Sequence, residues 1–136
     1  MMNARRLIIY LWTLPTTAVG LLFVFPTLLS GGSMRRHTGV LELSGGAVRF
    51  FLRHGTLLRN GAAAMTLGHV VLGQDQDDLD RTRTHERVHV RQAERWGPLF
   101  IPAYLIASVI QKLLGRHPYF DNPFEREAYA TDKVPC

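Results

Sequence analysis

The chain has 136 residues, a length that suits at most one small domain, and 46% of them are hydrophobic, which is apolar for a soluble domain of this size. The single cysteine, Cys136, excludes an intrachain disulfide. The net charge is +5, but the Arg residues are scattered and lack interleaved aromatic residues, so we expect no nucleic-acid partner and a basic surface that suits anionic lipid headgroups.

An uncharged run of 23 residues extends from Leu7 to Leu29, directly after Arg5 and Arg6. About 20 apolar residues in a helix are enough to cross the hydrocarbon core of a bilayer. Residues 1–33 therefore predict an N-terminal transmembrane helix that anchors a single-pass protein in the lipid bilayer. A cleaved signal peptide is the alternative, with the small residues of 30–33 as a cleavage site, although its apolar region is usually only about 7–15 residues long.

The next part of the chain has the pattern of a small antiparallel sheet. Short β-type runs at residues 39–43 and 47–52 flank a Ser-Gly-Gly sequence, which predicts a hairpin turn. A second turn is expected at 59–61, and a third strand at 64–72. Gly68 lies inside this last run, which indicates either a bulge or a close approach of another backbone.

Residues 79–96 have a helical pattern, and a Gly-Pro pair ends it. This stretch contains the motif His85-Glu86-x-x-His89. Residues four apart lie on the same face of a helix, so the two imidazoles point at one position, as two nitrogen ligands of a zinc ion do. The Glu86 carboxylate can reach a metal-bound water, which is the general-base position of zinc hydrolases. Gln92 lies on the same face.

A second helix is expected at residues 99–114, which are apolar apart from three polar positions. At 16 residues it is shorter than a full membrane span. We expect it to pack behind the motif helix or to lie in the membrane as an interfacial or re-entrant segment. A second complete span is the alternative.

The two histidines leave a zinc ion short of ligands, because catalytic sites usually have three protein ligands and a water. Asn122-Pro123 is a signal for the start of a final helix, and it places Glu125 in the first turn. Glu125 can return to the two imidazoles after the intervening helix, and Glu127 is a rival third ligand.

His85-Glu86-x-x-His89 followed by Glu125-Arg126-Glu127-Ala128 resembles the gluzincin metallopeptidases, most closely the membrane-associated members with a Glu-x-x-Ala-Asp motif. The resemblance covers about residues 81–130. It implies that Zn²⁺ is bound by His85, His89 and Glu125 and that Glu86 is the general base. Glu125 is preferred to Glu127 because the family places Ala three residues after its ligand.

One position departs from the family pattern. The family has an Asp at the fourth position after its glutamate ligand, and this chain has Tyr129 there. The partner that orients a ligand histidine must therefore come from elsewhere. By residue type alone, Tyr104, His117 and Tyr119 are candidates to stabilise an oxyanion.

Together these patterns predict an α+β fold with an N-terminal transmembrane helix, a small antiparallel sheet and a helical zincin-like core, in which residues 34–136 form a minimal metallohydrolase domain. The resemblance implies a membrane-anchored zinc metallopeptidase that cleaves a peptide or protein substrate through a zinc-activated water. The strand near 65–72 would receive an extended peptide by β-augmentation. The alternatives are a catalytically inactive zinc-binding membrane protein with a structural or regulatory role, and a helix on which both histidines are ordinary surface residues.

Overall fold

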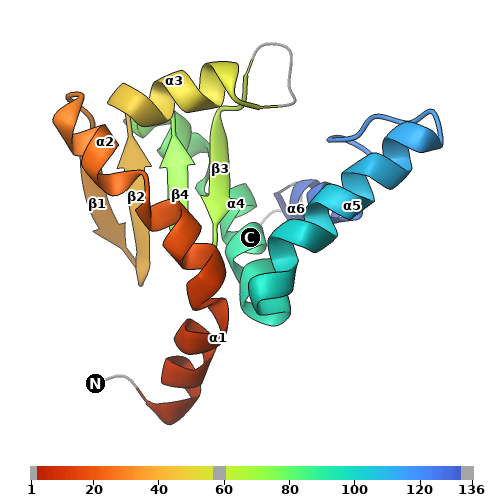
Figure 1. The fold of residues 1–136 in the computed structure, drawn as a ribbon, viewed down its shortest axis with the longest axis horizontal. Coiled ribbons are helices and arrows are strands. Elements are labelled where there is room, and N and C mark those ends of the chain that lie inside the picture. The colour runs from red at the N-terminus through yellow and green to blue at the C-terminus, as the bar shows by residue number, and fades with distance from the viewer. Residues whose placement is uncertain (1–2, 57–60, 133–136) are drawn as a thin grey trace.

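The computed structural model describes residues 3–56 and 61–132. It is a mixed α+β fold with a long apolar helical segment at the N-terminus, a four-stranded sheet and a helical C-terminal region (Figure 1). The elements in chain order are α1 (Ala4–Leu21), α2 (Val24–Leu29), β1 (Ser33–His37), β2 (Val40–Ser44), α3 (Gly46–His54), β3 (Ala64–Leu67), β4 (Val70–Gly73), α4 (Gln76–Trp96), the 3₁₀ turn η1 (Gly97–Leu99), α5 (Phe100–Leu113) and α6 (Pro123–Asp132).

The sheet has the strand order β1-β2-β4-β3 and is mixed. The outer pairs are antiparallel, but β2 and β4 are parallel, with Leu41 opposite Val70 and Leu43 opposite Leu72. The prediction of an antiparallel sheet is therefore wrong for the central pair. A parallel pair needs a crossover connection, and α3 lies in the chain between these two strands.

Residues 47–52, expected to be a strand, belong to helix α3. Val48 and Leu52 are fully buried and four residues apart, so the run has a helical apolar face as well as a β-type composition. Gly45 and Gly46 precede it with φ of 77° and 50°, a left-handed conformation that glycine adopts without strain. The chain therefore turns into a helix that covers one face of the sheet.

The single strand expected at 64–72 is two antiparallel strands, β3 and β4, joined by a tight turn at Gly68 and His69. The predicted close backbone approach at Gly68 is confirmed, because a Cβ there would lie 2.6 Å from the backbone nitrogen of Thr17. The backbone N–H of His69 donates to Thr17 Oγ1 at 3.0 Å. The second predicted turn, at 59–61, begins outside the described residues.

The hydrophobic core lies on both faces of the sheet. Side chains of a strand alternate between its two faces, so Val70 and Leu72 pack toward α3 whereas Val71 packs toward α4. The first cluster also contains Leu43, Val48 and Leu52, and the second contains Val40, Leu79 and Val90. The second cluster holds the motif helix against the sheet.

Helix α4 starts earlier than the sequence pattern suggests. Asp75 is its N-cap, and its Oδ1 accepts a hydrogen bond from the backbone N–H of Asp78 at 2.8 Å. The predicted end is confirmed, because Gly97 follows Trp96 with φ of 59° and begins η1. The apolar helix expected at 99–114 is α5, and the helix expected after Asn122-Pro123 is α6.

The N-terminal segment Ala4–Leu29 is long and apolar enough to span a membrane. In the structure it packs on the rest of the chain through small and polar side chains. Thr16 Oγ1 donates to the carbonyl oxygen of Gly97 at 2.9 Å, and Gly20 lies against Val70 and Leu67. The small residue at position 20 therefore sets how closely α1 approaches the β3–β4 hairpin.

Gly20→Val is expected to destabilise the fold by about 1–3 kcal/mol, because overpacking a close contact forces the neighbouring elements apart. A Cβ at this position would lie 2.6 Å from the Val70 Cβ. Thermal unfolding followed by circular dichroism in detergent micelles measures the change. Ala18→Val is the matched control, since Ala18 is exposed on the same helix, and equal melting temperatures for the two variants would contradict the expected contact.

Candidate metal centre

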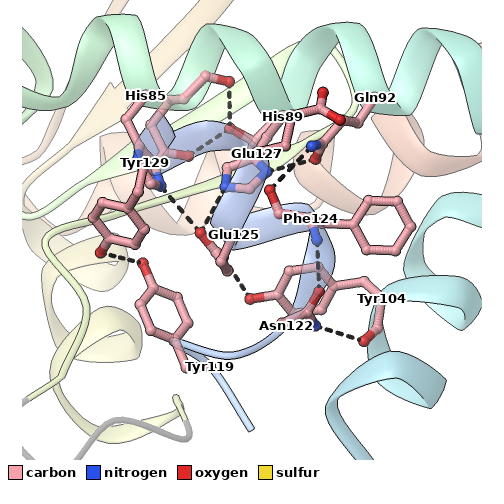
Figure 2. A network of polar contacts seen from close by, with 12 residues as sticks. His85, His89, Gln92, Tyr104, Tyr119, Asn122, Phe124, Glu125, Glu127 and Tyr129 are labelled. Atoms are coloured by element: carbon pink, nitrogen blue, oxygen red, sulfur yellow. Dashed lines mark hydrogen bonds and ion pairs between the residues drawn. The ribbon is translucent and has the colours of Figure 1, made fainter. Parts of the chain in front are cut away.

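Three side chains from two helices converge on one point. Nε2 of His85 and Nε2 of His89, both on α4, lie 3.0 and 2.9 Å from Oε1 of Glu125, in the first turn of α6 (Figure 2). All three side chains are buried. The i, i+4 spacing on α4 aims the two imidazoles together, and the packing of α6 against α4 brings the carboxylate to them.

This group can bind a metal ion, because its candidate ligand atoms all lie within 4.8 Å of one another. A tetrahedral ion with ligands at about 2.0–2.1 Å holds neighbouring ligand atoms about 3.3 Å apart. The observed separations of 2.9 and 3.0 Å need only a small expansion to reach that arrangement. Two imidazoles and one carboxylate suit zinc and other divalent transition metals.

The structure distinguishes the two carboxylates that the sequence offered as third ligand. Glu125 is only 4% exposed, and Ala128, three residues later on the same helical face, is fully buried. Glu127 is exposed. Residues two apart in a helix point in nearly opposite directions, so the helix that presents Glu125 to the imidazoles turns Glu127 to solvent.

Gln92 orients one of the two candidate ligand histidines. Its Oε1 lies 2.8 Å from Nδ1 of His89, and its Nε2 donates to the carbonyl oxygen of Phe124 at 3.0 Å. The second bond fixes the amide so that its oxygen faces the imidazole, and Nδ1 therefore carries the proton. Nε2, on the opposite side of the ring, faces Glu125 Oε1 and is the atom that a cation would bind in place of a proton. The sequence placed Gln92 on this face of the helix without assigning it a role.

Gln92→Leu is expected to weaken metal binding by about 10- to 100-fold, because removal of an orienting partner leaves the ligand imidazole without a fixed tautomer. Competition with a chromophoric chelator measures the dissociation constant. Arg91→Leu, at the neighbouring exposed position on α4, is the control. An unchanged affinity in Gln92→Leu would show that the His89 tautomer is set by something else.

Glu125 is held on its other oxygen by Tyr104, whose hydroxyl donates to Oε2 at 2.5 Å. Burial raises the pKa of the Glu125 carboxyl, but the hydrogen bonds with His85, His89 and Tyr104 outweigh burial and lower the pKa to about 2. Burial and the nearby carboxylate raise the pKa of Tyr104, so its phenol stays protonated and can donate. Glu125 is therefore a carboxylate at neutral pH.

Burial lowers the pKa of His89, but the hydrogen bond to Glu125 and the nearby carboxylates raise it to about 9. A cation that binds Nε2 of His89 must therefore displace a proton.

The start of α6 is fixed independently of these charges. Nδ2 of Asn122 donates to Ser108 Oγ at 2.8 Å, and Oδ1 of Asn122 accepts from the backbone N–H of Phe124 at 2.9 Å.

Glu86 lies beside the three candidate ligand side chains and is not one of them. Its Oε2 accepts a hydrogen bond from Thr66 Oγ1, on β3, at 2.6 Å. Burial raises the pKa of the Glu86 carboxyl. Glu86, His89 and Glu125 line a pocket of about 360 Å³ between β3 and α5, and the apolar side chains Leu67 and Leu105 form part of its wall.

The three candidate oxyanion donors lie in different places. Tyr104 and Tyr119 line the pocket. His117 is exposed, and its Nδ1 accepts hydrogen bonds from the backbone N–H groups of Tyr119 and Phe120 at 3.1 and 3.0 Å. His117 therefore stabilises the turn before α6 and does not line the pocket.

Tyr129 stands at the position where the gluzincin motif that this sequence resembles has an aspartate. Its ring packs edge-on against the imidazole of His85, with 4.4 Å between the ring centroids, and its hydroxyl lies 3.2 Å from that of Tyr119. Aromatic packing therefore positions His85, whereas an amide positions His89.

Comparison of the chain with protein-family models, curated proteins and solved structures finds no match to any of them.

Proposed function

We propose that this protein is a membrane-attached zinc hydrolase that cleaves peptide bonds. The observation that carries the proposal is the convergence of His85, His89 and Glu125 at one buried point, with the Glu86 carboxylate beside them at a pocket. Three protein ligands and an adjacent, separate carboxylate are the arrangement of a catalytic zinc site.

His85, His89 and Glu125 would hold a zinc ion here, which would supply an activated water and a Lewis acid for the substrate carbonyl group. Glu86 would accept the proton at Oε1, because Oε2 accepts the hydrogen bond from Thr66 and Oε1 has no hydrogen-bond partner among the described residues. The buried position of Glu86 makes the carboxylate a stronger base than it is in water. Tyr119 is the better placed donor to the carbonyl oxygen, since the Tyr104 hydroxyl already donates to Glu125.

The position of β3 supports a peptide substrate. Strand β3 is at the edge of the sheet and pairs with β4 alone among the described strands. Its residues Ala64 to Leu67 line the same pocket as Glu86. The unpaired backbone groups of an edge strand can bind an extended peptide by β-augmentation, and the scissile bond then lies beside the metal centre.

Purified full-length protein is expected to contain about one zinc ion per chain, measured by inductively coupled plasma mass spectrometry. It should cleave members of a broad peptide library, with products identified by mass spectrometry. 1,10-Phenanthroline should abolish cleavage, and added Zn²⁺ should restore it. Zinc retention without cleavage of any peptide would argue against the hydrolase.

A non-catalytic zinc-binding membrane protein is the second candidate, and the tyrosine at position 129 favours it, because the family's carboxylate is absent there. The fourth ligand separates the two proposals. A structural site is closed by protein ligands, whereas a catalytic one keeps a water. X-ray absorption spectroscopy of the zinc protein distinguishes a site completed by water from one completed by a side chain such as Tyr104.

A further inference from the structure

The segment α1–α2 turns its small and polar residues toward the rest of the protein and its large apolar residues outward, the opposite of a helix on a soluble domain. Its buried residues are small or polar, as Thr13, Thr16 and Thr27 are. Its large apolar side chains point outward, and Phe25 and Leu29 are 76% and 85% exposed. A helix on a soluble domain buries its apolar face against the core. The outward face of α1–α2 therefore requires an apolar environment.

The inward face is attached along most of its length. The Tyr10 hydroxyl donates to the carbonyl oxygen of Gly39 at 3.1 Å, and Thr27 lies against Gly32. A continuous helix would rise about 26 Å from residue 10 to residue 27, and α1 and α2 are interrupted over this stretch only by the turn at Leu22 and Phe23. A membrane span is surrounded by about 30 Å of hydrocarbon. The sheet and the C-terminal end of α4 would have to enter the hydrocarbon with this helix if it crossed the bilayer.

Those neighbouring elements carry charge. Trp12 Nε1 donates to the carbonyl oxygen of Arg95 at 3.5 Å, and the Arg91 side chain is exposed on the same helix as Arg95. Charged side chains at the centre of a bilayer are costly. The packing of α1 on this domain is therefore incompatible with a perpendicular span.

Helix α5 has a second outward apolar face. Phe100 and Ser108 are its buried residues, and five large apolar side chains are about half exposed or more. At 14 residues, or about 21 Å, α5 is too short to span. Helix α1 packs against η1, which leads directly into α5, so the two helices diverge from one corner (Figure 1). The exposed residues of α5 are Leu105, Ile106, Val109, Ile110 and Leu113.

The chain segments that contain the two apolar arms, α1–α2 and α5, are poor in acidic residues, and the acidic Glu94 beside α1 lies 3.5 Å from His69 Nε2. The sequence from residue 3 to 74 has one acidic residue, Glu42, which is buried and paired with Arg83 at 2.9 Å. Residues 95–120 have none. Basic residues stand near the ends of the arms, and this distribution is complementary to anionic headgroups. They are Arg5, Arg6, Arg35, Arg36, Lys112 and Arg116.

We propose that α1–α2 and α5 together form a monotopic membrane-binding surface, which inserts into one leaflet of an anionic bilayer and does not cross it. The apolar side chains lie among the upper acyl segments, and the basic residues lie at the headgroups. Leu105 belongs both to the α5 arm and to the metal pocket, so the pocket opens beside the leaflet. The proposal rests on the membrane attachment in the proposed function and not on hydrolysis.

Cysteine accessibility distinguishes a segment that inserts into one leaflet from a segment that crosses the bilayer. Arg6→Cys and Ser33→Cys, each in the Cys136→Ser background, place a thiol at an exposed position at either end of α1–α2. Spheroplasts expressing the full chain are treated with a membrane-impermeant maleimide before and after lysis. We expect both thiols to react on the same side. Reaction on opposite sides, or recovery of the chain in the soluble fraction, would overturn the proposal.

Vesicle binding tests the α5 arm. Ile110→Asp is expected to lower binding to phosphatidylcholine–phosphatidylglycerol vesicles by about tenfold or more, since an apolar contact with the leaflet is replaced by a charge that the headgroups repel. Thr84→Asp makes the same charge change at an exposed position of α4 and should bind as the wild type does. Equal binding by the two variants would show that α5 is not part of the membrane-binding surface.

These readouts are independent of catalysis. Glu86→Gln should bind vesicles as the wild type does, and when it is added to either cysteine variant it should leave the side of labelling unchanged, whatever its effect on activity. Opposite-side labelling together with zinc-dependent cleavage would overturn the monotopic surface alone. Same-side labelling without any cleavage would overturn the hydrolase alone.

Discussion

Glu86→Gln is expected to retain the metal ion and to lose about 10²- to 10⁴-fold in kcat, the usual contribution of a general base. The amide has nearly the same shape as the carboxylate, and its oxygen can still accept the hydrogen bond from Thr66 Oγ1. The ligand group of His85, His89 and Glu125 is untouched. Only the ability to take a proton from water is removed.

The measurement is the rate of cleavage of a peptide selected from the library, together with the zinc content of the same preparation. Glu94→Gln is the matched control, since it makes the same change eight residues further along α4, where the side chain lies 3.5 Å from His69 Nε2. The control should cleave at the wild-type rate. Full activity in Glu86→Gln would show that Glu86 is not the general base.

Glu125→Gln is expected to weaken zinc binding by at least about 100-fold, more than the loss of an orienting partner such as Gln92. An amide is a weaker ligand than a carboxylate for a divalent cation and brings no negative charge to the site. Glu127→Gln, two residues away on the same helix, should leave the affinity unchanged because its side chain is exposed.

Chelator competition gives both dissociation constants, and circular dichroism confirms that each variant is folded. This pair tests the geometry of α6 directly, because a helix rotated by two residues would exchange the two roles. A loss of affinity in Glu127→Gln with none in Glu125→Gln would show that the first turn of α6 faces the other way. Equal losses would assign the effect to net charge and not to coordination.

The prediction from sequence was most accurate for the helices. The pattern at 79–96 located α4 apart from its first turn, and Asn122-Pro123 located the start of α6. The sheet was less predictable. The run 47–52 has a composition that suits either a strand or a helix. The predicted hairpin would have paired this run with β2, but the strand that pairs with β2 at that edge is β4.

The amino-acid sequence by itself determined the two imidazoles on one helix face and the long apolar N-terminal segment, because both depend on spacing within a single stretch of chain. Only the tertiary structure decided that Glu125 and not Glu127 meets the histidines, that Gln92 orients His89, and that small and polar residues of α1 face inward. The contacts of Glu125 and of α1 join segments distant in sequence, and the orientation of Gln92 depends on its hydrogen bond with the carbonyl oxygen of Phe124 on α6. They depend on how α6 and α1 pack against α4 and the sheet, which no local pattern specifies.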